Sequence, residues 1–377
     1  MKVCGIIAEY NPFHNGHKYH IEKSREITGA DCIAVVMSAS FVQRGEVSVY
    51  SKHARAEAAI QGGADIVFEL PAYFSLQSAS GFAKGATGIL QAAKADYVSF
   101  GAECCDLEKL KNAARFLSDE PDDFREKLKK NLKHGYSFAR ARAEALRNLN
   151  HIDCADIISS PNNILAIEYL NAIQNTNIIP IAVERQKVIH DSDTPNGDFA
   201  SASHIRNALR QGNDVSEFMP FDIDEKPLFT EDFEDLILYA VRLCGNEISE
   251  MIPDCGDGIC ERILSSKATS LNALLESVKT KRFSMSRIKR VLMNILIENT
   301  LPQSLAPSYL RVLALNKRGA EYLKEIKKDA SLPIVTKPAS YKENDPIWDL
   351  EMRASKIRAI KAQTKTEDIA ISPVVVK

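Results

Sequence analysis

The sequence predicts an α/β protein with an open, parallel β-sheet in its first part and a mostly helical second part. Over residues 1–200, short β-branched hydrophobic runs alternate with amphipathic stretches. This alternation is typical of strands and helices that succeed one another in a parallel sheet. Beyond residue 212 the strand-like runs largely disappear, which favours helices there.

Each of the five predicted strands is hydrophobic along its whole length instead of alternating with polar residues. Such runs indicate strands that helices cover on both faces. In open sheets of this kind, ligands bind beyond the carboxyl ends of the strands, so we expect the site in the loops that follow them. The predicted strands are Val3–Ala8, Cys32–Met37, Asp65–Leu70, Asp96–Phe100 and Ile178–Val183.

Amphipathic segments between these strands predict the helices that cover the sheet. Phe124–Asn150 is interpreted as one or two basic helices inserted between the fourth and fifth strands, and a helix is expected from near Ser203 to Leu209. The other predicted helices are Gly16–Thr28, Lys52–Gln61, Gln77–Ala93, Leu107–Leu117 and Pro161–Ile173.

The second part differs in charge as well as in pattern. Residues 222–261 carry twelve acidic and two basic side chains, a net charge of 2 − 12 = −10. A helix with a basic cluster is predicted over residues 271–300, and the Pro-rich Leu332–Ala339 fits a short strand or an extended tail. We place a boundary near Gly212–Pro227. The two expected domains are residues 1–215 and a mostly helical domain of residues 216–377.

The composition excludes some classes of protein. With 48 Lys and Arg against 50 Asp and Glu, the 377 residues carry a net charge of −2. We therefore do not expect a protein that coats a polyanion over its whole surface, whereas a local basic patch is compatible with this charge balance. Eight cysteines without a C-x-x-C pair indicate buried, reduced thiols. Because we find neither a signal peptide nor a run of ~20 apolar residues, we expect a cytoplasmic protein.

The strongest motif is Glu9–His20 (EYNPFHNGHKYH), directly after the first predicted strand. It contains an H-x-G-H pattern formed by His14, Gly16 and His17. At the start of a helix, two histidines three residues apart share one face, and the free N–H groups of the helix end attract phosphate. Gly16 leaves room for a base or ribose. The pattern predicts a site that stabilises phosphate charge while pyrophosphate is displaced from a nucleoside triphosphate.

A second motif, Ala200–Arg206 (ASASHIR), follows the fifth predicted strand. Ser201 and Ser203 can cap a helix and donate to phosphate, and Arg206 can hold the β- and γ-phosphates. Each motif alone has a simpler interpretation: a chance histidine cluster or core histidines for the first, and an ordinary N-cap for the second. Their occurrence together favours a nucleotide site.

Segments across most of the chain resemble the tRNA(Met) cytidine acetate ligases, a family within the H-x-G-H nucleotidyltransferase superfamily. Ala200–Arg206 is similar to the I-S-S-T-x-I-R signature of that superfamily. The sequence departs from the pattern of the family at two places. Ser38–Ser40 lacks the Gly that the family pattern leads us to expect, and Glu46–Tyr50 lacks the expected Pro. Both departures affect the expected conformation of the loops beside the second strand. The other matching segments are Gly5–His17, Met37–Glu46, Ser51–Ile60, Gly63–Pro71, Ser99–Glu103, Ser160–Leu170 and Lys281–Leu296.

The resemblance implies a Rossmann-like fold and a two-step activity. Acetate would attack ATP to give acetyl-adenylate and pyrophosphate. The N4 amine of the wobble cytidine of elongator tRNA(Met) would then take the acetyl group, giving N4-acetylcytidine and AMP. His14 and His17 are the expected catalytic residues. The expected ATP-binding residues are Ile7, Ala8, Glu9, Tyr10, Asn11, Pro12, Phe13, His14, Asn15, Gly16, His17, Lys18, Tyr19, His20, Gly101, Asn162 (or its neighbour Asn163), Arg185, Ser201, Ser203 and Arg206.

One basic cluster indicates nucleic acid. Lys and Arg side chains contact RNA phosphates, although such a cluster also fits a solvated helix face; the resemblance favours tRNA. Gln43 and Arg44 could contact the triphosphate or the tRNA, or lie in a solvated loop. We predict no protein-bound metal, and Mg²⁺ is expected to accompany ATP. The predicted tRNA-binding residues are Lys281, Arg282, Arg287, Lys289 and Arg290.

Two other functions stay open at this point. The same motifs would serve a nucleotidyltransferase that builds a small cofactor from ATP and a phosphate ester. A non-catalytic module that binds nucleotide or RNA is the third candidate.

Overall fold

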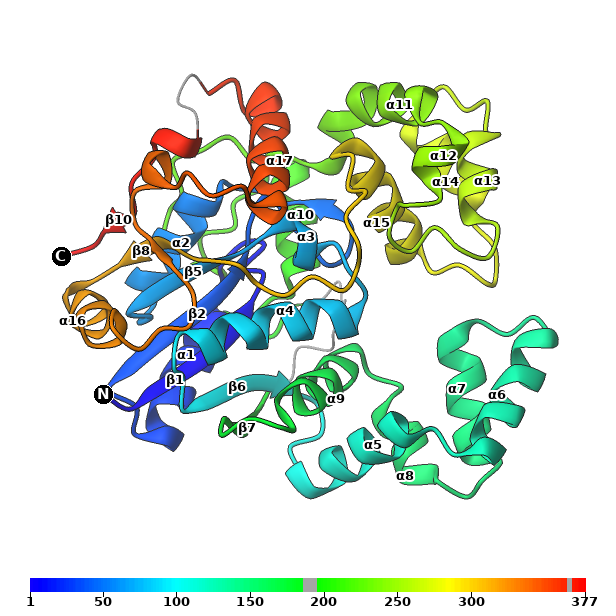
Figure 1. The fold of residues 1–377 in the computed structure, drawn as a ribbon, viewed down its shortest axis with the longest axis horizontal. Coiled ribbons are helices and arrows are strands. Elements are labelled where there is room, and N and C mark those ends of the chain that lie inside the picture. The colour runs from blue at the N-terminus through cyan, green and yellow to red at the C-terminus, as the bar shows by residue number, and fades with distance from the viewer. Residues whose placement is uncertain (186–194, 365–367) are drawn as a thin grey trace.

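The computed structural model is built around one mixed β-sheet (Figure 1). It describes residues 1–185, 195–364 and 368–377. The strands are β1 (Val3–Ala8), β2 (Cys32–Ser38), β5 (Ile66–Leu70), β6 (Tyr97–Ala102), β7 (Ile179–Glu184), β8 (Leu310–Leu315), β9 (Ile334–Val335) and β10 (Val374–Val375). Their order is β10-β8-β5-β2-β1-β6-β7, with β9 beside β8. Neighbouring strands run parallel except β5 and β8, which are antiparallel.

All five predicted strands are present, and the predicted α/β fold class is confirmed. β1 has the predicted bounds, and the other four differ only at their ends. Every residue of β2 and of β5 is buried, which explains why their sequences do not alternate. Successive residues of β2 face opposite sides: Ala34 and Val36 join one hydrophobic core, and Ile33 and Val35 join the other.

Helices cover both faces of the sheet (Figure 1). Apart from the short Ala72–Ser75, which the sequence did not predict, they occur where amphipathic segments were predicted and bury an apolar stripe against the strands. No helix in the described ranges is both long and apolar enough to cross a bilayer. The helices next to the sheet are α1 (Asn15–Thr28), α2 (Lys52–Gln61), α3 (Ala72–Ser75), α4 (Ala79–Ala92) and α9 (Pro161–Ile173).

Between β6 and β7 the chain leaves the sheet and forms a helical extension, at the lower right of Figure 1. The basic segment predicted over Phe124–Asn150 is confirmed as two helices that pack against each other. The extension consists of α5 (Leu107–Asp119), α6 (Asp122–Lys133), α7 (Phe138–Arg147) and α8 (Ile152–Ile157).

After β7 the chain forms α10 (Ala202–Arg210) and then a helical lobe, at the upper right of Figure 1. This confirms the predicted helical character of the region. The structure pairs Cys255 with Cys260 as a disulfide, their Cα atoms 5.3 Å apart, where the sequence indicated reduced thiols. The lobe contains η1 (Thr230–Phe233), α11 (Glu234–Leu243), α12 (Asn246–Ser249), α13 (Ile259–Leu264), α14 (Leu271–Val278) and α15 (Met285–Leu296).

The end of the chain departs from the expected helical pattern because it returns to the sheet. β8 pairs antiparallel with β5, and β9 forms within the predicted Leu332–Ala339. The division into residues 1–215 and 216–377 stays a prediction, but the last strands complete the sheet of the first part. The remaining elements are α16 (Lys317–Ile326), η2 (Pro338–Ser340), α17 (Pro346–Ala362) and η3 (Asp368–Ala370).

A buried group of charges joins the two ends of the chain. Lys52 on α2 lies 2.5 Å from Glu69 of β5, 3.0 Å from Glu351 of α17 and 2.9 Å from Asp368 of η3. Arg311 of β8 lies 2.7 Å from Asp368 and 3.3 Å from Glu69. Because buried charges are stable only when paired, each element of this group depends on the others for its position.

Candidate active site

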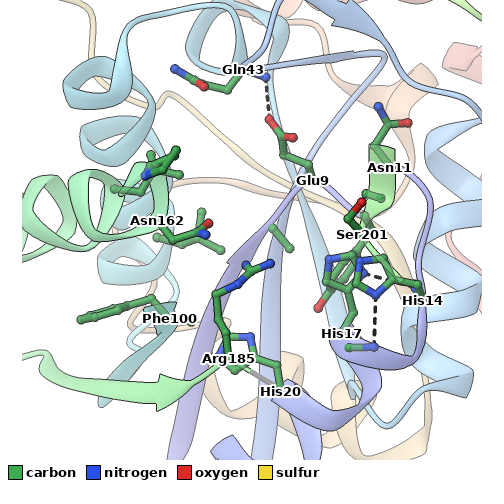
Figure 2. A pocket seen from close by; sticks show the side chains of 18 of the residues that line it. Glu9, Asn11, His14, His17, His20, Gln43, Phe100, Asn162, Arg185 and Ser201 are labelled. Atoms are coloured by element: carbon green, nitrogen blue, oxygen red, sulfur yellow. Dashed lines mark hydrogen bonds between the residues drawn. The ribbon is translucent and has the colours of Figure 1, made fainter. Parts of the chain in front are cut away.

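A cavity of about 420 Å³ opens beyond the carboxyl ends of β1, β6 and β7 (Figure 2). This is where open parallel sheets bind their ligands. Both sequence motifs and the start of α9 contribute to its wall. The predicted residues that line it are Ile7, Ala8, Glu9, Tyr10, Asn11, His14, Gly16, His17, Tyr19, His20, Gly101, Asn162, Arg185, Ser201, Ser203 and Arg206.

Four residues of the predicted nucleotide segment, Pro12, Phe13, Asn15 and Lys18, are not among those that line this cavity. Phe13 is buried in the core. The Asn15 side-chain amide donates to the backbone carbonyls of residues 198 and 217, at 2.8 and 2.9 Å. These two side chains therefore hold the loop in place instead of facing the cavity.

His14 and His17 begin α1, and each holds the other in place. His14 is the N-cap, and its Nδ1 accepts a hydrogen bond from the backbone N–H of Gly16 at 3.1 Å. The Nδ1 of His17 accepts from the backbone N–H of His14 at 3.2 Å, and the two rings stack with centroids 3.6 Å apart. A neutral imidazole that accepts at Nδ1 carries its proton on Nε2. Both rings therefore offer an Nε2–H donor.

The imidazoles of this cluster are neutral. Burial, helped by the charges of Arg185 and Arg206, lowers the pKa of His14 to about 3. Burial and the neighbouring His14 hold the pKa of His17 well below its ordinary value. Burial and Arg185 lower the pKa of His20 to about 4. Neutral donors beside cationic arginines form a surface suited to a phosphate anion.

The second motif meets the first across the cavity. Ser201 is the N-cap of α10, and its Oγ accepts from the backbone N–H of His204 at 3.1 Å. Arg206 is only 9% exposed, and its Nη1 donates to the backbone carbonyl of Asn11 at 2.9 Å. Asn11 belongs to the loop of the first motif. The two motifs are thus directly joined, as their predicted role requires.

The ends of β6 and β7 and the start of α9 form the other side of the cavity (Figure 2). A Cβ at Gly101 would lie 3.2 Å from Cγ of Arg185, so a larger residue there would displace that arginine. The Asn162 side chain donates to Glu103 at 2.6 Å at the cavity wall. Asn163 is buried, and its Oδ1 accepts from the backbone N–H groups of residues 103 and 104. Asn162, not Asn163, therefore lines the cavity.

A short hairpin, β3 (Phe41–Val42) and β4 (Glu46–Val47), adds residues to the wall. The backbone N–H of Gln43 donates to Oε1 of Glu9 at 2.7 Å. Gln43, Arg44 and Glu46 all line the cavity. Glu46 was not predicted as a site residue, because a glutamate in a loop gives no signal of its surroundings.

The wall also contains an apolar patch that sequence reasoning missed. Phe82 of α4, Phe100 of β6, and Ile164, Leu165 and Tyr169 of α9 line the cavity. Only Phe100 could have been suspected, because it ends a strand directly before a predicted site glycine. The other four follow the spacing of ordinary core residues on helices, and the sequence does not show which of them border a cavity.

The predicted tRNA-binding cluster does not form one free cationic surface. Arg287, Lys289 and Arg290 are engaged within the protein, at 3.1, 2.6 and 2.7 Å from their carboxylates, and Arg290 is only 7% exposed. Lys281 and Arg282 are exposed. The acidic partners are Asp257, Glu46 and Asp254 respectively.

The fold and the site define a class of protein: a nucleotidyl transferase that carries its histidine pair at the start of the first helix of an α/β sheet. The family model described as HIGH Nucleotidyl Transferase matches residues 1–370. Relatives called tRNA(Met) cytidine acetate ligase match almost the whole chain. The relative from Caldicellulosiruptor saccharolyticus is 38% identical over 96% of this chain and 94% of its own. The relative from Clostridium perfringens is 35% identical over 100% of both.

Solved structures agree with these relatives. A crystal structure of Thermotoga maritima TmcAL bound with α-thio ATP has a TM-score of 0.88 and 32% identity, over 100% of both chains. The apo form has a TM-score of 0.91. The chain belongs to the tRNA(Met) cytidine acetate ligase family.

Proposed function

We propose that this protein is an ATP-dependent ligase that joins acetate to N4 of the wobble cytidine in elongator tRNA(Met), through an acetyl-adenylate. The observation that carries this proposal is the capped histidine pair that shares one cavity with Arg206. The names of the relatives and the α-thio ATP bound by the Thermotoga maritima structure support it. Because ATP and tRNA are used together in the cytoplasm, we propose that the protein acts there.

In the first step, a carboxylate oxygen of acetate attacks the α-phosphorus of ATP. The bond from that phosphorus to the oxygen that bridges to the β-phosphate breaks, and pyrophosphate leaves with the electron pair. The Nε2–H groups of His14 and His17 would stabilise the charge on the phosphoryl oxygens, and Arg206 would hold the leaving phosphates. Because both imidazoles stay neutral, they act as donors throughout this step.

In the second step, N4 of cytidine attacks the acetyl carbon. The bond from this carbon to the phosphate oxygen breaks, AMP leaves with the electron pair, and N4 loses a proton. An acyl-adenylate reacts readily with water, so the cavity must exclude water while this intermediate is present. The apolar patch of Phe82, Phe100 and Tyr169 would serve this purpose.

We propose that Mg²⁺ accompanies ATP as the partner of its phosphate oxygens. Within the described ranges, no three His, Cys, Asp or Glu side chains come together in a way that could hold a metal. The donors of such an ion would then be phosphate oxygens and water, which is the coordination that Mg²⁺ prefers. The chain's own residues bind and orient the nucleotide.

Mass spectrometry of tRNA nucleosides tests the function. We expect N4-acetylcytidine after incubation of tRNA(Met) with protein, ATP and acetate, and none when either small molecule is omitted. Without tRNA, acetate should support exchange of labelled pyrophosphate into ATP. Acetylation without acetate would refute the mechanism. Adenylyl transfer to pantetheine phosphate or nicotinamide mononucleotide would favour a cofactor-building enzyme, and tight tRNA binding without ATP turnover a non-catalytic module.

A further inference from the structure

The helical extension between β6 and β7 carries an exposed surface with no role in the site described above. We propose that α6, α7 and the turn between them (residues 122–147, the basic arm) bind the unpaired RNA loop that presents the acceptor cytidine. The identity of that RNA rests on the proposed function. The location is new, because the sequence placed the tRNA contact in the helical lobe, around α15.

The basic arm concentrates positive charge in a chain that is nearly neutral. Its 8 − 4 = +4 net charge contrasts with the −10 of residues 222–261 in the helical lobe. RNA phosphates favour the first surface and oppose the second. The basic residues of the arm are Arg125, Lys127, Lys129, Lys130, Lys133, Arg140, Arg142 and Arg147, and the acidic ones are Asp122, Asp123, Glu126 and Glu144.

Half of the basic side chains of the arm are also available, whereas Arg125 and Arg147 are paired with carboxylates. Lys129, Lys130, Lys133 and Arg140 are exposed, and no ion pair involves them among the residues that the structure describes. This differs from α15, where three of the five predicted tRNA-binding cations are paired with carboxylates. A cation that is already paired gains little from a phosphate. The free cations of the basic arm therefore form the better phosphate-binding surface.

Aromatic side chains on the arm suit unpaired bases. Phe138 is 54% exposed at the start of α7. The guanidinium carbon of Arg140 lies 4.2 Å from the ring centroid of Tyr136 in the turn. Exposed rings and arginine planes beside lysines are how proteins stack the bases of single-stranded RNA. A double-stranded stem would use the lysines but would leave the rings exposed, so the arm fits a loop.

The arm lies beyond the carboxyl end of β6, a strand end that borders the cavity. In Figure 1 it projects beyond the carboxyl end of β6, on the side of α9. α7 packs on α8, α8 on α5, and α5 on α9. α9 in turn lines the cavity through Asn162, Ile164 and Tyr169. An RNA loop held on the arm would thus have a continuous protein surface leading to the place where its cytidine must enter.

The test compares two matched triple variants in the full-length protein. The arm variant is Lys129→Ala, Lys130→Ala and Lys133→Ala. The control is Lys324→Ala, Lys327→Ala and Lys328→Ala, which removes three exposed lysines in and just after α16. We expect the arm variant to weaken tRNA(Met) binding about tenfold or more and to lower the salt slope by about two to three, while the control resembles wild type.

Pyrophosphate exchange without tRNA checks that the arm variant still folds and activates acetate. A Phe138→Ala variant should lose tRNA(Met) affinity but keep the wild-type salt slope, because stacking involves no phosphate. Equal tRNA affinity in the arm variant and wild type would overturn the proposal. So would a larger loss in Lys281→Ala with Arg282→Ala, which would return the contact to the turn before α15. If the wild-type protein neither acetylates tRNA(Met) nor exchanges pyrophosphate into ATP, the proposed function is wrong. In that case, unchanged RNA binding by the arm variant would still refute the proposal that the basic arm binds RNA.

A second observation, independent of the arm, concerns Glu9. We infer that Glu9 is the base that takes the proton from N4 in the second step, which also rests on the proposed function. Figure 2 shows its carboxylate between the histidine pair and the side of the cavity formed by Asn162 and Phe100. Gln43 fixes Oε1, and among the described residues Oε2 has no hydrogen-bond partner.

Other basic groups in the cavity wall are less suited to this role. The Nε2 of His20 lies 3.0 Å from Oγ of Ser99, and Glu184 is exposed to solvent. The Nδ1 atoms of His14 and His17 accept backbone hydrogen bonds, and their Nε2 atoms carry protons. Glu46 is paired with Lys289 at 2.6 Å and lies 3.5 Å from Arg206. Burial raises the pKa of Glu9, and the nearby Glu46 adds to this, although the Gln43 hydrogen bond and the charges of Arg44 and Arg206 act in the opposite direction; the net rise makes its carboxylate a stronger base. Oε2 would take the proton as N4 bonds to the acetyl carbon and AMP leaves with the electron pair of the broken bond.

The variant Glu9→Gln separates the two steps. Because Glu9 also lines the nucleotide cavity, both steps can slow, but we expect acetyl transfer to lose about a hundredfold or more and acetate-dependent pyrophosphate exchange to lose far less. Wild-type transfer should rise with pH and level off above the pKa of Glu9, and the variant should lack this rise. Glu26→Gln, an exposed change on α1, should behave as wild type. An equal loss in both steps would assign Glu9 to nucleotide binding, and unchanged transfer would also refute the inference.

Discussion

At His14 and His17, helix capping and phosphate binding use the same two rings. The Nδ1 atoms satisfy backbone N–H groups that every helix start leaves unpaired, and this fixes the protons on Nε2, facing the cavity. A cap of aspartate would satisfy the same backbone groups but would offer no donor to a phosphate. The pair therefore combines local stability with the chemistry proposed for it.

Two variants of His14 should separate these roles. Asparagine is a good N-cap but has no Nε2–H, so His14→Asn should keep the stability of wild type and lose about a hundredfold or more in pyrophosphate exchange. His14→Ala should lose the same activity and in addition about 1 kcal/mol of unfolding free energy. Denaturant melts and exchange rates measure both. If exchange survives in His14→Asn, the ring is only a cap.

The low pKa of His14 makes stability depend on pH. The folded protein holds this ring neutral down to a pKa of about 3, while the unfolded chain binds the proton near the ordinary value of about 6.5. Stability is therefore complete above pH 6.5 and falls as the pH decreases. Between pH 7 and pH 5, His14 should cost about 2 kcal/mol of unfolding free energy. Denaturant melts of wild type and His14→Asn at both pH values measure it, and an equal pH dependence would contradict the assignment.

Sequence reasoning at this scale located the residues whose chemistry is unusual for their position. Two histidines and a glycine after a strand, and an arginine after a serine cap, are conspicuous because a core does not need them. The apolar patch was missed because Phe82 and Tyr169 have the spacing of ordinary core residues. Only the fold shows that these side chains border a cavity.

At the scale of elements, the β3–β4 hairpin connects the cavity with the helical lobe. Gln43 holds Glu9 on one side, and Glu46 binds Lys289 of α15 on the other. Gly45 has a φ of +75°, and a Cβ there would overlap the backbone of Arg290. The hairpin can lie this close to α15 only because the residue has no side chain.

The substitution Gly45→Ala should therefore move the hairpin away from α15. We expect it to weaken ATP binding. We also expect it to destabilise the protein by more than Gly29→Ala, which should cost about 1 kcal/mol of unfolding free energy. Gly29 has a similar φ of +59°, but a Cβ there would meet nothing within 4 Å. Calorimetry of ATP binding and denaturant melts compare the two. Equal losses in both variants would mean that the contact with α15 has no influence on the cavity.

The strands and long helices of the first 185 residues were largely predictable, whereas the β3–β4 hairpin and most elements beyond residue 300 were not. β1, β2, β5, β6 and β7 were evident because each is a short hydrophobic run between predicted helices, although β7, at the edge of the sheet, is only partly buried. Leu310–Leu315 was missed, although its sequence is equally apolar, because it follows a long helical region. Its pairing with β5 spans more than half of the chain, and such long-range pairings leave no local pattern.

At the scale of the whole molecule, the buried charge group ties the nucleotide half to the end of the chain. Lys52 is 4% exposed and Glu69 is fully buried. Removing one member leaves its partners charged and buried, which is far more harmful than removing an exposed pair. This group, and not only the apolar core, therefore decides whether β8 and α17 stay on the sheet.

The substitution Lys52→Met should destabilise the protein by about 3 to 5 kcal/mol. Lys23→Met breaks the exposed pair with Glu26 and should cost less than about 0.5 kcal/mol. Denaturant melts of both variants make the comparison. Similar small losses of unfolding free energy in both variants would show that the buried carboxylates become protonated or hydrated at a small free-energy cost.

The position of β8 beside β5 also affects synthesis of the protein. The histidines and β5 leave the ribosome early, but the strand that pairs with β5 is made among the last. Until then, β5 presents unpaired backbone groups that can bind other chains. A message cut short before residue 310 would yield a polypeptide that keeps both nucleotide motifs, lacks the cover for that edge, and aggregates.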